Sequence, residues 1–176
     1  MFHRFRSRPA IFALLLTALV FTGCPMSPGP DPWTAEQEWI YENLHGTWSA
    51  ANLGGDSWVI DAADNNFQTL AYDMGSGIAF EGRILEVQLF DDDGSVGVIL
   101  IRYRERPTDW EQSEPVAGDY IGVFFSNLTA TTGQFAAPVD ENWLTPAQTS
   151  LAAARRAFTV DTMGDYVGVW ATYVRQ

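Results

Sequence analysis

The single cysteine, Cys24, has the most distinctive chemistry in this chain, because a thiol can carry a lipid, bind a metal or take part in redox reactions. It follows a segment in which three arginines precede a short apolar run at 9–21. A positive start, a short apolar run and small residues before a cleavage point are typical of a secretory signal peptide. The run is too short to span a bilayer, so residues 1–23 are expected to be a signal peptide.

Cys24 ends the stretch FTGC, which resembles the lipobox of bacterial lipoproteins, although Phe21 departs from the more usual leucine. The resemblance implies cleavage before Cys24, a diacylglycerol thioether on its sulfur and an acyl chain such as palmitate on its amino group. Two or three chains, at roughly 0.8 kcal/mol per buried CH₂, would anchor the protein in effect irreversibly. Pro25 follows the cysteine where Asp would favour retention at the inner membrane, so the same resemblance implies the outer membrane. The alternative is an ordinary secreted protein with a stray thiol.

Few other residues suit catalysis or metal binding. His45 is the only histidine beyond the signal segment, which leaves a histidine-based metal site or a serine–histidine pair without a second histidine. The three acids at 91–93 are adjacent, whereas a Ca²⁺ loop supplies oxygens at alternate positions, so we expect a solvated turn. No G-x-S-x-G, H-E-x-x-H, Walker or dinucleotide-binding motif is present. We therefore expect no catalytic residue, no metal and no cofactor.

The chain beyond residue 23 has 176 − 23 = 153 residues, which suits one domain. It contains seven arginines, no lysine and 22 acidic residues, for a formal net charge of 7 − 22 = −15. Such a surface repels nucleic acid, so no nucleic-acid partner is expected. A proline-rich tether at 24–33 should connect the anchor to one domain at 34–176, which we expect to be monomeric.

Short β-branched and aromatic runs, separated by turn residues, predict eight strands after His45. They span 46–52, 56–62, 66–72, 77–91, 95–105, 118–127, 129–137 and 165–175. DDDGS at 91–95 places an Asp-Gly pair between two apolar runs, which is a strong hairpin signal. Gly82 lies where the apolar alternation of the longest strand slips, which indicates a bulge or a sharp bend.

Two helices are also expected. At 34–44, Thr34 and Gln37 make a capping-box pattern, and at 145–158 Thr145 is the expected N-cap residue. The predicted fold is mainly β: a single eight-stranded up-and-down antiparallel barrel with a short N-terminal helix and one helix before the last strand. An open sandwich is the competing architecture.

HGTWSA at 45–50 resembles the Gly-x-Trp signature of lipocalins and related calycin barrels. In that family the tryptophan packs at the closed end of the barrel, and an arginine or lysine of the last strand crosses it. The resemblance therefore implies a barrel floor made of Gly46, Trp48 and Arg175, with a cation–π contact. The alternative is that Trp48 is an ordinary core residue and Arg175 a solvated terminus.

Three longer stretches are similar to lipocalin-like lipoproteins of spirochaetes and related bacteria, at 97–103, 118–136 and 161–176. The likeness covers most of the domain. It implies a fold and a location, and it brings no established activity.

Aromatic residues of the expected strands are candidates for lining an internal cavity, because eight-stranded barrels either are filled by side chains or hold one small ligand. The candidate cavity-lining residues are Trp58, Phe80, Tyr103, Phe124 and Trp170. The same residues could equally form a solid core.

Arg102 and Arg104 alternate with Tyr103 in the expected strand at 95–105. The face that carries Tyr103 is otherwise apolar and is expected inside, so both arginines should point outward. A cavity without an inward arginine should prefer neutral, planar or cationic molecules to fatty acids.

Two classes of function follow. The first is a lipid-anchored barrel of the outer membrane that binds a small apolar or cationic ligand. The second is a packed barrel that serves as a non-enzymatic structural or protein-interaction module at the cell surface. A cavity of roughly 300 Å³ or more, lined by aromatic residues, would favour the first class, and a filled interior would favour the second.

Replacing Cys24 with alanine is expected to give a folded domain that partitions into the aqueous phase of a detergent separation, because Cys24 precedes every expected strand. Ser27→Ala, in the same tether, should leave partitioning unchanged. Membrane fractionation and circular dichroism measure the two properties. If Cys24→Ala protein that has lost residues 1–23 remains in the membrane fraction, the anchor is wrongly assigned.

Overall fold

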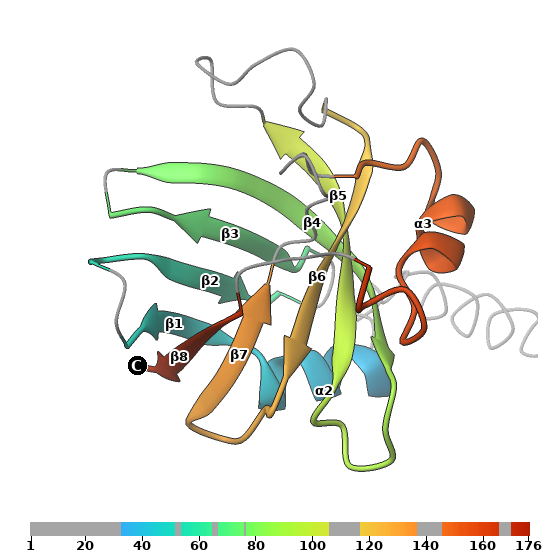
Figure 1. The fold of residues 1–176 in the computed structure, drawn as a ribbon. Coiled ribbons are helices and arrows are strands. Elements are labelled where there is room, and N and C mark those ends of the chain that lie inside the picture. The colour runs from blue at the N-terminus through green and yellow to red at the C-terminus, as the bar shows by residue number, and fades with distance from the viewer. Residues whose placement is uncertain are drawn as a thin grey trace, which may run out of the picture. The chain divides into compact units, whose positions relative to one another are not determined.

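A computed structural model describes residues 33–51, 54–64, 67–75, 77–105, 117–136, 146–165 and 170–176, which form a closed antiparallel barrel with two helices (Figure 1). In chain order the elements are α2 (Ala35–Asn43), β1 (Gly46–Ala50), β2 (Ser57–Asp61), β3 (Thr69–Asp73), β4 (Ile78–Leu89), β5 (Gly97–Glu105), β6 (Tyr120–Ser126), β7 (Thr132–Ala136), α3 (Leu151–Ala157) and β8 (Ala171–Arg175). Each strand pairs with the next along the chain, and β8 returns to β1. The predicted fold class is confirmed, and the open sandwich is excluded.

Helix α2 begins with the capping box that the sequence predicts. The Thr34 hydroxyl accepts a hydrogen bond from the Gln37 backbone N–H at 3.2 Å, and the Gln37 side chain accepts one from the Thr34 N–H at 2.8 Å. Ile40 and Leu44 are buried in the same core as the barrel strands, so α2 covers one end of the barrel (Figure 1). Within the described residues, no helix has both the length and the apolar character needed to cross a membrane.

The hairpin between β4 and β5 confirms the turn expected at 91–95. The Asp91 carboxylate accepts hydrogen bonds from the Ser95 hydroxyl at 2.7 Å and from the Val96 N–H at 3.1 Å. The Ser95 hydrogen bond lowers the pKa of Asp91. Asp93 accepts from the Ser95 N–H at 3.0 Å. These acids therefore bind the turn's own donors, as in a solvated turn.

Strand β4 carries the irregularity expected near Gly82. Its pairing with β5 shifts register between Glu81 and Gly82 and again between Ile84 and Glu86. Each shift places an extra residue on one strand, which bends that strand and exchanges the faces on which its side chains lie. These two register shifts therefore account for the slip in apolar alternation near Gly82.

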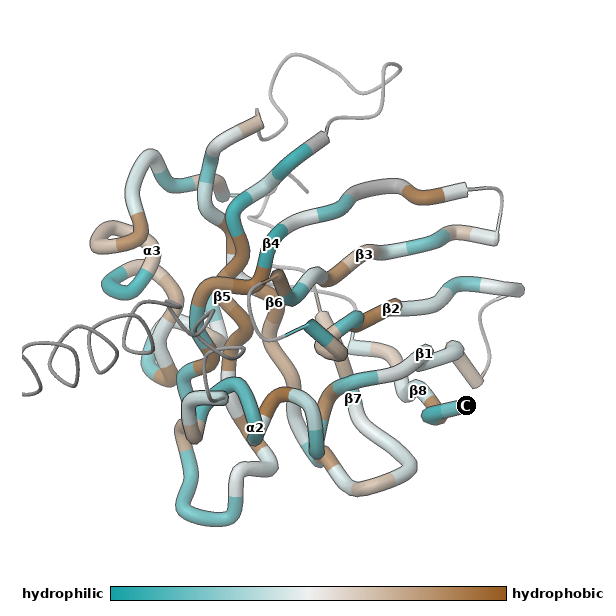
Figure 2. Tube along the Cα trace, turned by 180° about the vertical axis from the view of Figure 1, so that it is seen from behind, coloured by the Kyte–Doolittle hydropathy of each residue, from teal (hydrophilic) through white to brown (hydrophobic). Residues whose placement is uncertain are grey.

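Strand β5 is buried on both faces over its apolar half, and Figure 2 colours this part of the strand as hydrophobic. Its inward side chains, Ile99, Ile101 and Tyr103, belong to the barrel core. Its outward side chains Val98 and Leu100 belong to a second core under α3. Further along, Arg102 and Arg104 are exposed on the outer face, as the alternation predicts.

Helix α3 is shorter than expected. Ser150 is its N-cap, and the Ser150 hydroxyl accepts from the Ala153 N–H at 3.2 Å. The expected N-cap, Thr145, lies outside the described residues. The prediction that Gln148 is helical is wrong. Its backbone N–H and C=O each bond the backbone of Tyr120 at 2.8 Å. The sheet satisfies these two groups, so the helix begins only after them.

Gly82→Ala is expected to lower the free energy of unfolding by about 1–3 kcal/mol, as an overpacked core does. A Cβ at this position would lie 2.6 Å from Ile101 Cδ1 and 3.1 Å from the Arg102 carbonyl oxygen. Urea denaturation measures the change. Gly54→Ala is the control, because no atom lies within 4 Å of its added Cβ.

Ile101→Val removes Cδ1 and should itself cost about 0.5–1.5 kcal/mol. The double variant should nevertheless be more stable than the sum of the two single changes predicts, because valine makes room for the new methyl group. Strict additivity would contradict this packing argument.

Candidate functional site

The barrel floor joins the first strand, the last strand and α2 at Trp48. This side chain has no exposed surface, and its Nε1 donates a hydrogen bond to the Leu44 carbonyl oxygen at 2.7 Å. The guanidinium carbon of Arg175 lies 5.6 Å from the centroid of the Trp48 ring, and Nη1 donates to the Glu42 carbonyl oxygen at 3.2 Å. The structure thus places Arg175 over Trp48, so Arg175 is not a solvated terminus.

Gly46 and His45 complete this end of the barrel. Gly46 has φ 131°, and a Cβ there would lie 3.3 Å from Arg175 Nε, so a side chain would strain the backbone and crowd the guanidinium. His45 Nδ1 accepts a hydrogen bond from the Ala62 N–H at 3.0 Å, and its ring stacks on Tyr41 at a centroid distance of 5.1 Å. His45 therefore ties the region after β2 to the end of α2.

Aromatic rings contact one another on one side of the barrel interior. The Trp58 ring lies 4.7 Å from Tyr72 and 6.2 Å from Phe135, measured between centroids. Phe135 also contacts Trp48 at 5.2 Å and Tyr173 at 5.8 Å. These spacings are those of packed aromatic pairs, so the rings fill the space between them.

The other inward side chains are equally enclosed. Leu70, Ile99, Ile101, Val123 and Phe125 are all 0% exposed. A water-sized sphere therefore has no access to these side chains. The described part of the interior is a packed core.

The candidate cavity-lining residues divide into three groups. Trp58 and Tyr103 point inward and are each 2% exposed. The side chain of Phe80 lies outside the described residues. The expectation is wrong for Phe124 and Trp170, which do not line the interior.

The alternation of inward and outward side chains along a strand explains why Phe124 and Trp170 do not line the interior. In β6 the inward position belongs to Phe125, so Phe124 points outward and contacts Phe158 near the end of α3 at 6.2 Å. Trp170 precedes β8 and is 36% exposed, while Tyr173 is the inward aromatic residue of that strand. Sequence reasoning missed Tyr173, although two-residue alternation with Arg175 could have identified it.

The aromatic rings approach a carboxylate, Asp56, near the end of β1 that is farther from α2. The Tyr72 hydroxyl donates to Asp56 Oδ2 at 2.7 Å. Burial, reinforced by the Asp56 hydrogen bond, raises the pKa of Tyr72 well above its ordinary value of 10.0. Burial also raises the pKa of Tyr173. Both phenols therefore stay protonated at neutral pH, and Tyr72 acts as a donor to the carboxylate.

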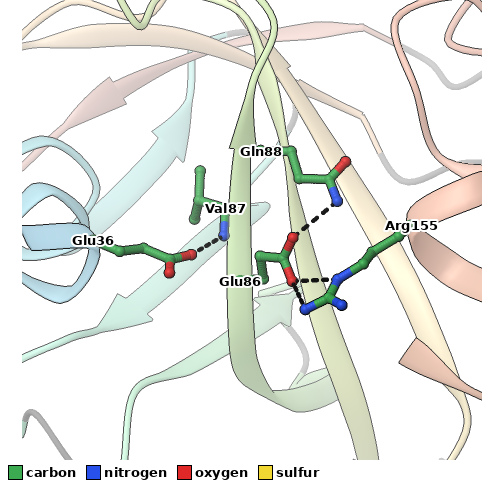
Figure 3. Close-up of polar contacts among 5 residues, drawn as sticks. All are labelled: Glu36, Glu86, Val87, Gln88 and Arg155. Atoms are coloured by element: carbon green, nitrogen blue, oxygen red, sulfur yellow. Dashed lines mark hydrogen bonds and ion pairs between the residues drawn. The ribbon is translucent and has the colours of Figure 1, made fainter. Parts of the chain in front are cut away.

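A groove of about 590 Å³ runs along β4 between α2 and α3, outside the barrel core. Figure 3 shows how both helices attach to this strand. Glu36 of α2 accepts a hydrogen bond from the Val87 N–H at 2.7 Å, and Glu86 forms an ion pair with Arg155 of α3 at 2.6 Å. Gln88 donates to the other oxygen of Glu86 at 3.0 Å.

Glu86 is ionised in this arrangement. Burial acts to raise the pKa of Glu86, but the hydrogen bonds from Arg155 and Gln88 outweigh it and lower the pKa below its ordinary value of 4.5. The two carboxylates of the groove thus hold the helices in place. Over the residues that the structure describes, no group of three His, Cys, Asp or Glu side chains could hold a metal ion.

In comparisons with known proteins, no protein family, no curated protein and no solved structure matches this chain.

Trp48→Ala is expected to lower the free energy of unfolding by about 3–5 kcal/mol, as truncation of a buried aromatic residue does. Arg175→Ala should cost less, because its guanidinium is near the surface. The two side chains touch, so the double variant should lose less stability than the sum of the single variants. A double-mutant cycle in urea measures this coupling, and additive losses would show that the ring and the guanidinium do not interact.

Proposed function

We propose that this chain is a lipid-anchored lipoprotein of the outer membrane whose packed barrel serves as a non-enzymatic protein-interaction module. Cys24 is the proposed lipid attachment site, and residues 24–33 are the tether. The barrel is monomeric in this proposal, and it presents its outer surface to another envelope or host component. The observation that carries the proposal is the filled interior of the described barrel.

Side chains fill the described interior of the barrel. A carrier of small molecules needs an internal space of several hundred Å³. The inward side chains of β5 and β6 are at most 2% exposed, and the aromatic rings on the other side contact one another. The described hollows with volumes near that range lie beside α2 or on the outside of the sheet. A partner that binds the outer surface needs no change in the core.

Charge supports a basic partner. With 22 acidic residues against seven arginines beyond residue 23, the protein carries a strongly negative field. Such a field speeds the encounter with a positively charged surface and slows the approach of acidic ones. The proposed partner is therefore a protein with a basic face.

A second candidate is the binding of a small cationic or planar molecule at the end of the barrel near Asp56. The observation that favours it is the contact of the Asp56 carboxylate with Tyr72, next to the Trp58 ring. A carboxylate beside aromatic faces is the chemistry that recognises organic cations. The Asp56 carboxylate is already bonded to the Tyr72 hydroxyl, so a cationic guest would have to compete with this hydrogen bond.

Native mass spectrometry of the full-length lipidated protein, extracted from its own host in a non-ionic detergent, distinguishes the two candidates. The interaction module should appear as a monomer with its lipid mass and no further small molecule. Cross-linking in intact cells before extraction should add a discrete partner protein. Tyr72→Phe is the matched variant, because it keeps the ring and removes the hydroxyl that binds Asp56.

Two results would overturn the first candidate. One is a co-purified small molecule that Tyr72→Phe releases, which would favour ligand binding. The other is the absence of any cross-linked partner in cells where the anchored protein is abundant. A measured mass without the lipid would instead refute the lipid anchor but not the protein-interaction module.

A further inference from the structure

Two exposed aromatic rings meet on the outer side of α2, away from the barrel core. The centroids of the Trp33 and Tyr41 rings lie 5.1 Å apart, and the ring planes are inclined by 76°. Trp33 is 37% exposed and Tyr41 is 44% exposed, so neither ring serves mainly to fill a core. Together with Glu38 and Glu42, the two rings line a hollow of about 480 Å³.

Contacts on either side of the hollow position the two rings. The His45 ring stacks on Tyr41 at a centroid distance of 5.1 Å, and its Nδ1 accepts a hydrogen bond from the Ala62 N–H at 3.0 Å. Trp33 directly precedes Thr34, whose backbone N–H and hydroxyl are both bonded in the capping box. A ligand therefore meets rings that are already oriented, which lowers the entropic cost of binding.

The two glutamates concentrate negative charge at an unfavourable place. Glu38 and Glu42 are four residues apart on α2, a spacing at which like charges repel and weaken a helix. Glu42 also lies in the last turn, where the helix dipole disfavours an acidic side chain and where α2 has no basic residue. Both glutamates are exposed, so core packing does not require them. A cation in the hollow would reduce both costs.

No arginine of the described chain neutralises these carboxylates. Among the residues that the structure describes, neither Glu38 nor Glu42 belongs to an ion pair. Arg175 reaches the same end of α2, but its Nη1 donates to the main-chain carbonyl oxygen of Glu42, and its guanidinium lies over Trp48. The side chains that line the hollow therefore combine two carboxylates with two aromatic rings.

We propose that this hollow is a binding site for a small organic cation that carries a quaternary ammonium group. Such a group spreads its charge over apolar methyl groups, has no hydrogen to donate and is attracted by the faces of aromatic rings. The two carboxylates supply the opposite charge without the need for a directed hydrogen bond. The site lies on α2 outside the barrel core, so it does not depend on the proposed protein-interaction function.

The same chemistry could come from a free soluble cation or from the head group of a choline lipid. Both present a trimethylammonium group, but the head group also carries a phosphate. Glu38 and Glu42 would repel that phosphate, so the charges of the hollow favour the free cation. The strongly negative field of the whole protein attracts cations as well, and affinity should fall as salt screens these charges.

The test is isothermal titration calorimetry on the full-length lipidated protein in a neutral detergent, with choline as the probe. Trp33→Leu should weaken binding about three- to tenfold, because it removes a cation–π contact. Trp170→Leu is the matched control, because it removes an exposed tryptophan that does not line the hollow, and it should change the affinity less than about twofold.

The charge of the hollow is tested in the same way. Glu42→Gln should weaken choline binding about two- to fivefold, the range of an exposed ionic contact. Asp161→Asn removes one exposed carboxylate outside the hollow and should have a smaller effect. Neohexyl alcohol, in which carbon replaces the choline nitrogen, keeps the shape without the charge and should bind at least about tenfold more weakly than choline.

Glycerophosphocholine distinguishes the two sources of the cation. Binding as tight as that of choline or tighter would identify a lipid head group, and weaker binding would identify a soluble cation. The proposal is overturned if choline does not bind at low salt, or if neohexyl alcohol binds as tightly as choline. It is also overturned if Trp170→Leu weakens choline binding as much as Trp33→Leu, because the hollow would then not be the site.

Discussion

The contact of Trp48 with Arg175 and Leu44 is the point at which the barrel closes. Trp48 lies opposite both Trp58 of β2 and Arg175 of β8, so one residue joins the second strand to the last. Its indole N–H bonds the carbonyl group that ends α2, which fixes the helix across the same end of the barrel. Because these contacts link segments from both ends of the domain, forming them carries a large loop-closure cost during folding.

The packing of the described interior constrains the rest of the structure. There, aromatic and branched side chains fill the space between the strands. The surplus apolar residues of β5 and β6 cannot enter it and point outward, where α3 covers them with Ala154 and Phe158. The chain therefore has two cores on the two faces of one sheet, and new functions are more easily placed on the outer surface than inside.

Local signals predicted most of the fold, and long-range contacts explain what they missed. The eight strands, the Thr34 cap, the hairpin at 91–95 and the Gly82 bulge all follow from neighbouring residues. The start of α3 does not, because Gln148 is held by Tyr120, a residue distant in the sequence. The pair Phe124–Phe125 gives no sign of which ring points inward until the register of β6 is known. The surface hollow lined by Phe67, Arg83, Arg102 and Gly118 was hidden for the same reason, since these residues meet only in the folded sheet.

One hydrogen bond on β4 has a consequence for how two copies of this barrel can meet. The paired register of β3 ends opposite Arg83, so the following part of β4 has a partner strand only on its β5 side among the described residues. On the other side, the Glu36 carboxylate takes the place of a strand carbonyl at the Val87 N–H. Unprotected strand edges template aggregation, and charge beside an edge discourages it. Helix α2 thus covers this part of the β4 edge and discourages identical barrels from pairing edge to edge.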